Sequence, residues 1–478
     1  MAVVCAAQFV LQLDFSIVNV SLATVQREFP MAPADLQWIV TGYALTFGSL
    51  LLVGGRLADY LGRRRLLVLG LVIFGIASLT CGLAVGPVML IISRFAQGAA
   101  GALVSPAALS LLTTSHAEGQ ARTRALAIWQ ATTAAGATAG VVFGGLLTEY
   151  LGWRAVFLVN PPIIVILLAL VPLLPHGRPE QARAKVDYWG ALLITGSLAL
   201  LIFGLSNGQQ NGFTSPASLV AFALAVSAGV AFVVTERSVV APMLPLRILS
   251  DPARRTAIGA MLMIGGVLAA YVYFISLYMQ HVLGYSPVRT GLGLLPSTLT
   301  LVLTTTFLAR RLLSRFGVKP VLIAGLVSMA GGQVWLAQLG VGSDYVTAVL
   351  PGLLLTALGV ALALPGASVA ITNGVARADQ GLAGALFTTS QQTGAAVGLA
   401  ILATAAATRT AHAVGSTAQT LTDGYRLSFL IGGGIVSAGA LLVAVGMRPP
   451  RRSEVAVEGD VPGNSDLVGR HSSFKEVR

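Results

Sequence analysis

Charged side chains are scarce in this chain of 478 residues. Asp, Glu, Lys and Arg together make up 10% of it, whereas a soluble protein of this size carries about a quarter. Hydrophobic residues reach 55%, and the mean hydropathy is +0.81. This balance argues against an ordinary soluble globular domain and predicts a multi-pass protein of the cell membrane.

Cysteine is almost absent as well. Its two copies, Cys5 and Cys81, lie inside apolar runs, so a disulfide framework is not expected. The five histidines show no metal-ligand spacing, and no His-Glu-x-x-His, Gly-x-Ser-x-Gly or phosphate-binding loop occurs. We therefore predict that the chain is neither an enzyme nor a self-contained ATP-driven pump, and that it needs no metal ion and no cofactor.

Long apolar runs dominate what is present. Each can cross a bilayer as a helix of about 20 residues, and Gly and Pro recur within them, as membrane helices tolerate. We predict an all-α integral membrane protein with fourteen spans. Their approximate cores are 3–25, 36–55, 66–86, 88–113, 125–149, 154–175, 187–206, 216–236, 256–281, 290–313, 319–340, 346–371, 382–408 and 425–447.

The basic residues of the chain, whose net charge is +12, gather in alternate loops. If the N-terminus is cytoplasmic, the loops and the tail on that side hold 24 of the 30 Lys and Arg residues. Because Lys and Arg are retained in cytoplasmic loops, both termini are predicted to be cytoplasmic. The same distribution argues against nucleic acid as a partner, since the charge forms no single binding face.

A weak internal repeat relates the two ends of the predicted bundle. The segment Arg310–Gly325 lines up with Gly55–Gly70 at an offset of 255 residues, so that Gly317 matches Gly62. Matched halves with a site between them are common in transporters. We therefore predict two pseudo-symmetric six-helix bundles, residues 1–176 and 255–447, with two additional central transmembrane helices in 187–236 and a disordered cytoplasmic tail in 448–478.

Two ionisable residues lie inside predicted spans, where a charge is costly and by default serves function. Asp14 is in the middle of the first span, and Arg94 is in the first half of the fourth. Because low-dielectric surroundings favour a neutral carboxyl group, Asp14 is predicted to load and release about one proton per transport cycle. Two alternatives stay open, namely a structural ion pair between Asp14 and Arg94 and an arginine that snorkels to the interface.

Polar side chains within the spans suggest a substrate pathway. On the first span, Gln12 and Asn19 share one face while Asp14 lies on another, so one of the two faces must contact a neighbouring helix. For Gln391, a pathway position and a bond across helices are both open. The predicted pathway residues are Gln12, Asn19, Gln97, Gln391 and Gln392.

The fifth span carries a row of glycines. Gly136, Gly140 and Gly144 recur at steps of four, and Gly145 follows directly. Small residues at this spacing lie on one face of a helix and let a second helix approach closely. We therefore predict that these four glycines serve helix packing rather than chemistry.

A short cationic loop follows the second span. Its residues are Gly55-x-Leu57-Ala58-Asp59-x-x-Gly62-Arg63-Arg64. They resemble, at every defined position, the signature loop of the major facilitator superfamily, Gly-x-Leu-Ala-Asp-x-x-Gly-Arg-[Arg/Lys]. The resemblance implies a cytoplasmic latch between helices two and three, whose Asp helps to hold the outward-open state. That role would fall on Asp59, with Gly62, Arg63 and Arg64 beside it.

Further motifs resemble one branch of this family, the fourteen-span drug:proton antiporters that act as multidrug resistance exporters. This resemblance implies a part in proton transfer for Arg94. One position departs from the branch, because Val141 replaces the proline of its helix-five motif Gly-x-x-x-Gly-Pro-x-x-Gly-Gly, which leaves the direction of proton coupling open. The matching stretches are Leu13-Asp14-x-x-Ile17-Val18-Asn19-Val20, Arg94-x-x-Gln97-Gly98, Trp153-Arg154-x-x-Phe157-x-x-Asn160-x-Pro162 and Gln391-Gln392-x-Gly394.

The resemblance and the intramembrane acid together predict proton-coupled efflux of lipophilic small molecules, such as a drug, an antibiotic or a secondary metabolite, by alternating access. The alternative is a proton-coupled symporter or facilitator of a small polar solute, although importers of sugars usually carry more buried polar groups than this chain has. The expected partners are the small-molecule substrate, protons and the lipid bilayer. We expect the protein to be a monomer.

Overall fold

The computed structural model describes residues 1–115, 120–174, 188–239, 250–373, 375 and 380–447. Within these ranges all regular structure is helical, and no strand occurs. Among the described residues, eleven helices are long and apolar enough to cross a membrane, and α3 and α9 contain shorter apolar stretches, Trp38–Leu51 and Leu192–Leu205. The predicted all-α membrane fold is confirmed, whereas the count of fourteen spans stays a prediction. The predicted disordered tail, 448–478, lies outside the described residues.

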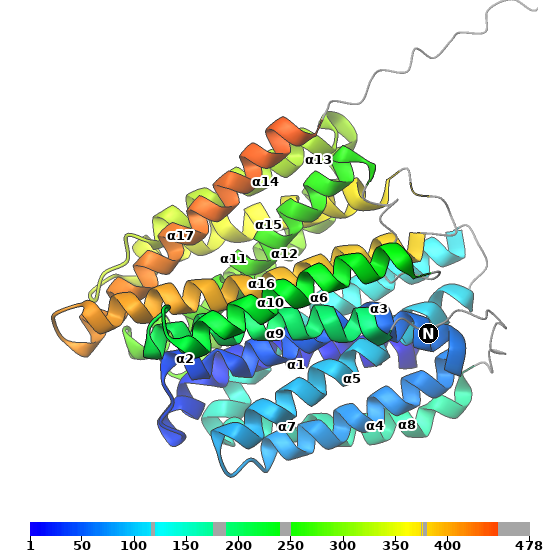
Figure 1. Ribbon diagram of the computed structural model, residues 1–478, viewed down its shortest axis with the longest axis horizontal. Coiled ribbons are helices and arrows are strands. Elements are labelled where there is room, and N and C mark those ends of the chain that lie inside the picture. Colours follow the sequence, from blue (N-terminus) through cyan, green and yellow to red (C-terminus); the bar gives the residue numbers. More distant parts are fainter. Residues whose placement is uncertain (116–119, 175–187, 240–249, 374, 376–379, 448–478) are drawn as a thin grey trace, which may run out of the picture. The chain divides into compact units, whose positions relative to one another are not determined.

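In the described residues, each of the predicted apolar segments lies mostly on helix (Figure 1). The first group is α1 (Ala2–Glu28), α2 (Pro33–Leu36), α3 (Trp38–Leu61), α4 (Arg63–Gly82), α5 (Pro87–Thr114), α6 (Gln120–Tyr150), α7 (Trp153–Leu158), α8 (Asn160–Leu170) and η1 (Val171–Leu173). The next two are α9 (Tyr188–Asn211) and α10 (Pro216–Ser238). The last group is α11 (Pro252–His281), α12 (Pro287–Leu303), η3 (Thr304–Ala309), α13 (Arg310–Phe316), α14 (Val318–Leu336), η4 (Tyr345–Val349), α15 (Leu350–Thr372), α16 (Gln380–His412) and α17 (Thr417–Gly446).

Local sequence explains where several of these helices begin and end. Three helices that have proline in their first turn are capped by the side chain of the preceding residue, which accepts a hydrogen bond from a backbone N–H. These capping residues are Ser215, Asp251 and Ser286. Gly62 and Gly317 separate consecutive helices with φ of 91° and 80°, a conformation that residues with a side chain rarely adopt. These two glycines are the pair that the internal repeat aligns.

Most helix contacts lie within the first or the last group. α1 packs on α6, and α3 and α4 pack on α5, while α11 packs on α16 and α17, and α14 packs on α15 and α17. The two groups meet where α3 contacts α16, where α6 contacts α12 and where α1 contacts α11. α9 packs on α10 and also touches α3 and α16, so it contacts both groups (Figure 1).

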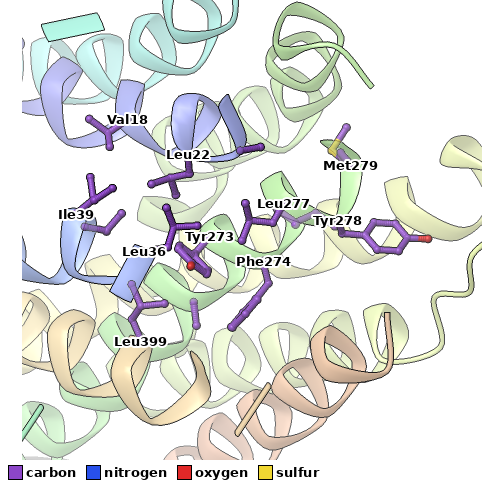
Figure 2. Packing of buried hydrophobic residues seen from close by; sticks show 14 of the residues in the cluster. Val18, Leu22, Leu36, Ile39, Tyr273, Phe274, Leu277, Tyr278, Met279 and Leu399 are labelled. Atoms are coloured by element: carbon purple, nitrogen blue, oxygen red, sulfur yellow. The ribbon is translucent and has the colours of Figure 1, made fainter. Parts of the chain in front are cut away.

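The buried apolar residues form two cores to which both groups contribute and others to which they do not. One of the two joins Ala44 of α3 to Ala395 of α16 and includes Ile202 of α9. We call the larger one the shared core. The shared core joins Leu22, Leu36 and Ile39 of the first group to Tyr273, Phe274 and Leu399 of the last (Figure 2). Near the start of α1 and the end of α17 the cores are separate. Val3 and Leu112 belong to one of them, and Ala257 and Val443 belong to the other. The two groups therefore pack together most closely at the end of the bundle away from Met1.

Candidate functional site

A buried ion pair joins α1 to α5. Asp14 and Arg94 expose 0% and 1% of their surface, and Arg94 Nη1 lies 2.6 Å from Asp14 Oδ2. Since the guanidinium is buried and paired, it does not snorkel to the membrane interface, and that alternative is wrong. A buried pair repays its desolvation only when additional hydrogen bonds satisfy the remaining lone pairs and protons.

Two amides complete the surroundings of the carboxylate. Gln97 Nε2 and Asn160 Nδ2 donate hydrogen bonds to Asp14 Oδ1 at 3.1 and 2.7 Å. Gln97 Oε1 accepts from Arg94 Nη1 at 2.8 Å, and Asn160 Nδ2 also donates to Ser78 Oγ at 2.9 Å. These side chains from α1, α4, α5 and α8 form one buried cluster, which we call the Asp14 network.

The guanidinium of Arg94 is also held from the side of α3. Its Nε donates to the Ile39 carbonyl at 2.8 Å, and its Cζ lies 4.5 Å from the centre of the Tyr43 ring. A cation over an aromatic face is attracted by the quadrupole of the ring, more strongly when water is absent. Arg94 therefore has partners that do not depend on the charge of Asp14.

The carboxylate of Asp14 accepts hydrogen bonds from three side chains. These side chains are the guanidinium of Arg94 and the amides of Gln97 and Asn160. A proton on Asp14 would remove the charge that Arg94 pairs with and would place an O–H where donors now point. Because the partners lie on α4, α5 and α8, such a change acts on four helices at once.

The face of α1 that carries Gln12 packs on α6. A Cβ built on Gly136 would lie 3.1 Å from Gln12 Cβ, and Ser16 Oγ donates to the Ala137 carbonyl at 2.7 Å. The other face, with Asp14, packs on α5 and α8 of the same group. Both faces therefore contact neighbouring helices, and which of them lines the pathway stays a prediction.

The glycine row of α6 lies against the same face of α1. Cβ atoms on Gly136 and Gly144 would each lie 2.7 Å from a backbone oxygen of α1, those of Phe9 and Ile17. Gly145 has a different neighbour, since its Cβ would lie 2.6 Å from the Pro287 carbonyl oxygen at the start of α12. Such distances leave no room for a side chain, so these glycines set the spacing of α6 to both helix groups.

Asn19 lies at a contact between α1 and α11. Its carbonyl accepts a hydrogen bond from Ser276 Oγ at 3.1 Å, and the Val20 carbonyl accepts one from Gln280 Nε2 at 3.0 Å. Both donors are buried. These bonds join the two helix groups beside the shared core.

Gln391 and Gln392 lie at helix crossings of α16. Both are half-buried. The Gln391 backbone lies against Gly265 of α11, and Gln392 Cβ lies against Gly48 of α3. The pathway roles of Gln12, Asn19, Gln97, Gln391 and Gln392 stay predictions, and Gln97 has its place in the Asp14 network.

The model of the Major Facilitator Superfamily matches residues 4–304 and 262–476, which together span nearly all of the chain. The chain belongs to the Major Facilitator Superfamily. It is therefore a multi-pass membrane transporter of small molecules, in agreement with its helical fold.

Named relatives of this superfamily member are similar over most of their length. The cephamycin export protein CmcT of Amycolatopsis lactamdurans is 39% identical over 404 residues, 84% of this chain and 83% of the relative. The puromycin resistance protein pur8 of Streptomyces alboniger is 36% identical over 417 residues, 86% and 82% of the two chains. Among solved structures, a bacterial homolog of the human lysosomal transporter Spinster, in an inward-facing and occupied conformation, has a TM-score of 0.68 at 14% identity, covering 93% of this chain and 95% of that one.

The signature loop of the superfamily lies between α3 and α4. Gly62 is the residue with positive φ that separates these helices, and Arg63 and Arg64 are half-buried in the first turn of α4. The side chain of Asp59 lies outside the described residues. The latch role of these four residues stays a prediction.

Sequence reasoning missed several members of the site of this transporter. Asn160 and Ser78 bind into the Asp14 network, and Tyr43 stacks on Arg94, yet none was assigned a role. In the sequence, Asn160 is one position of the stretch Trp153-Arg154-x-x-Phe157-x-x-Asn160-x-Pro162. A usable signal was that Asn160 is a polar residue at the start of an apolar helix, directly followed by two prolines.

Proposed function

We propose that this transporter exports lipophilic small molecules of the antibiotic or secondary-metabolite class in exchange for protons, and that Asp14 carries the proton. The Asp14 network supports this proposal, because one carboxylate there can be neutralised either by Arg94 or by a proton. The named relatives support the substrate class, since two of them are named for cephamycin export and puromycin resistance.

Asn160 offers protonated Asp14 a hydrogen-bond acceptor. Its Oδ1 is buried and has no hydrogen-bond partner within the described residues, while its Nδ2 donates to Asp14. Protonated Asp14 becomes a hydrogen-bond donor, and a half-turn of the Asn160 amide would offer it this unused oxygen. The network can thus accept a proton without leaving the new O–H unpaired.

Alternating access follows from how the cores are shared. With both termini in the cytoplasm, the shared core and the bonds from Ser276 and Gln280 to α1 lie toward the outer side and close it. The separate cores lie toward the cytoplasm, so substrate would enter between the two helix groups from there. Release outward requires the contacts between α1 and α11 to break and the cytoplasmic ends to approach.

Transport by purified protein in liposomes tests the proposal. A puromycin-like or β-lactam substrate and a pH-sensitive dye are followed together while a pH difference is imposed. One pH unit is worth about 1.4 kcal/mol per proton, which supports about tenfold accumulation for one proton per substrate. We expect substrate and protons to move in opposite directions. Movement in the same direction would establish the symporter instead, and unchanged accumulation after collapse of the pH difference and the voltage would refute proton coupling.

The shared core contains a polar group that has no partner. Tyr273 Oη is buried and forms no hydrogen bond within the described residues, although the ring packs edge-on against Phe274 at 5.1 Å (Figure 2). Such a group costs about 1–3 kcal/mol. Tyr273→Phe is therefore expected to stabilise this conformation, raise the melting temperature of the purified protein and slow transport severalfold.

Tyr278 is the matched control, because its Oη donates to the Gly340 carbonyl at 2.6 Å. Tyr278→Phe should lower the melting temperature, since it removes a bond instead of an orphaned group. A lower melting temperature for Tyr273→Phe would show that its hydroxyl is satisfied and would remove this account of how the contact opens.

A further inference from the structure

A groove of about 500 Å³ lies where α9, α16 and α17 meet, away from the Asp14 network. Its volume falls within the range of about 300–1,000 Å³ that is usual for ligand sites. Phe213 and Ile401, on its wall, expose 46% and 41% of their surface. Since α16 is a candidate membrane span, a groove on its exposed side would be open to lipid. Its apolar lining residues are Leu205, Phe213, Ile401, Ala405 and Leu427.

One end of the groove is cationic. Arg409 and His412 line it and belong to the last turn of α16. They share a face of the helix with Ile401 and Ala405, because these positions are separated by three or four residues along the chain. The groove is therefore apolar along its length and positive at its end, which is the pattern of an amphiphile with an anionic head.

The charge of Arg409 is not balanced by the protein in the described part of the chain. α9 carries no charged residue, and Asp423 on α17 has its own partner, Arg426, at 4.0 Å. No ion pair of Arg409 occurs among the described residues. The ring of His412 is held by Nδ1, which lies 2.8 Å from the Thr408 carbonyl oxygen. Nε2 is the other ring nitrogen, and it donates to a ligand only when both ring nitrogens carry a proton.

A third polar group lies deeper in the groove. Thr404 lines it and exposes 5% of its surface, and its hydroxyl has no hydrogen-bond partner within the described residues. Five residues separate Thr404 from Arg409, or about 7–8 Å along the helix axis. In a phospholipid the phosphate head, the ester groups and the acyl chains follow one another in the same order as Arg409, Thr404 and the apolar lining, and over a similar distance.

We propose that this groove binds one anionic phospholipid of the bilayer, with its phosphate at Arg409 and His412, an ester oxygen at Thr404 and an acyl chain along Leu205 and Ile401. Basic pockets between membrane helices bind anionic head groups, and arginine forms paired hydrogen bonds with phosphate. The lipid would tie α9 to α16 and α17. This site is independent of the direction of transport and of the proton carrier.

Native mass spectrometry of the full chain tests the site. The purified protein is titrated with phosphatidylglycerol or with phosphatidylcholine of the same acyl chains, and the first bound lipid is counted. We expect phosphatidylglycerol to bind about tenfold more tightly. The variant Arg409→Gln/His412→Gln should bind both lipids equally, and Thr404→Val should weaken both. Arg426→Gln removes a neighbouring cation that is already paired and should keep the preference.

Two further measurements distinguish a misfolded charge variant and a site for soluble anions from a true lipid site. Ile401→Trp fills the groove and leaves Arg409 and His412 in place, so it should lose the tight lipid even if the charge variant does not fold. Inorganic phosphate at millimolar concentration should not displace phosphatidylglycerol, and displacement would indicate a site for soluble anions. Equal binding of the two lipids by the unaltered protein, or a preference that survives Arg409→Gln/His412→Gln, would overturn the proposal.

Discussion

Asp14→Asn is expected to abolish accumulation of substrate against its gradient while leaving the protein in the membrane. The amide has nearly the shape of the carboxylate, so packing around α1 is kept. It cannot exchange a proton, and the accumulation ratio that one pH unit supports should fall from about ten to one. The measurement is uptake into everted vesicles with an imposed pH difference.

The same change also leaves Arg94 without a buried counter-ion, which costs about 3–5 kcal/mol. A loss of transport could therefore reflect a loss of structure. The double variant Asp14→Asn/Arg94→Gln separates loss of proton exchange from loss of structure, because it also removes the unpaired charge of Arg94. We expect it to recover most of the melting temperature and none of the uphill transport.

Recovery of uphill transport by the double variant would show that the ion pair is structural and that another group carries the proton. Asp423→Asn is the control for a carboxylate near a helix end. Its pair with Arg426, at 4.0 Å, is partly exposed, and such pairs contribute about 0–1 kcal/mol. Transport by Asp423→Asn should match that of the unaltered protein.

The sequence contained enough to predict the helices and to single out the two residues of the ion pair. Apolar length alone located the helices, because a bilayer demands internally bonded backbone. Asp14 and Arg94 could be singled out since intramembrane charges are rare, and their pairing was one of two alternatives. The glycine row on α6 could be assigned to packing from its spacing, and Gly136 and Gly144 do approach carbonyls of α1.

The partners of Asp14 could not be found in this way. Asn160 and Ser78 lie 146 and 64 positions along the chain from it, and only the folding of α1 against α4 and α8 brings them together. Neutral polar side chains are common in membrane helices, so neither residue type nor spacing marked Ser78, and the two prolines that follow Asn160 were its only signal. Similarly, Tyr273 looks like one more aromatic in an apolar run, and only the packing of the shared core leaves its hydroxyl without a partner.

Gly140→Ala is expected to damage transport nearly as severely, although the residue carries no chemistry. A Cβ there would meet Ser16 Oγ and would lie 2.7 Å from the Leu13 carbonyl oxygen. Backbone cannot yield as a flexible side chain can, so α1 must move away from α6. Overpacking of this kind costs about 1–3 kcal/mol. Leu13 directly precedes Asp14, and the shift therefore reaches the 2.6 Å ion pair with Arg94.

Comparison with a glycine in open surroundings isolates this effect. Gly434 on α17 has no atom within 4 Å of a built Cβ, and Gly→Ala in a helix is favourable by up to about 1 kcal/mol. Gly434→Ala should thus match or exceed the unaltered protein in melting temperature and should transport normally. Gly140→Ala should lower the melting temperature and reduce proton-driven uptake about tenfold at equal expression. If both variants behave alike, α1 and α6 are not held at this distance by Gly140, and the proton site does not depend on their spacing.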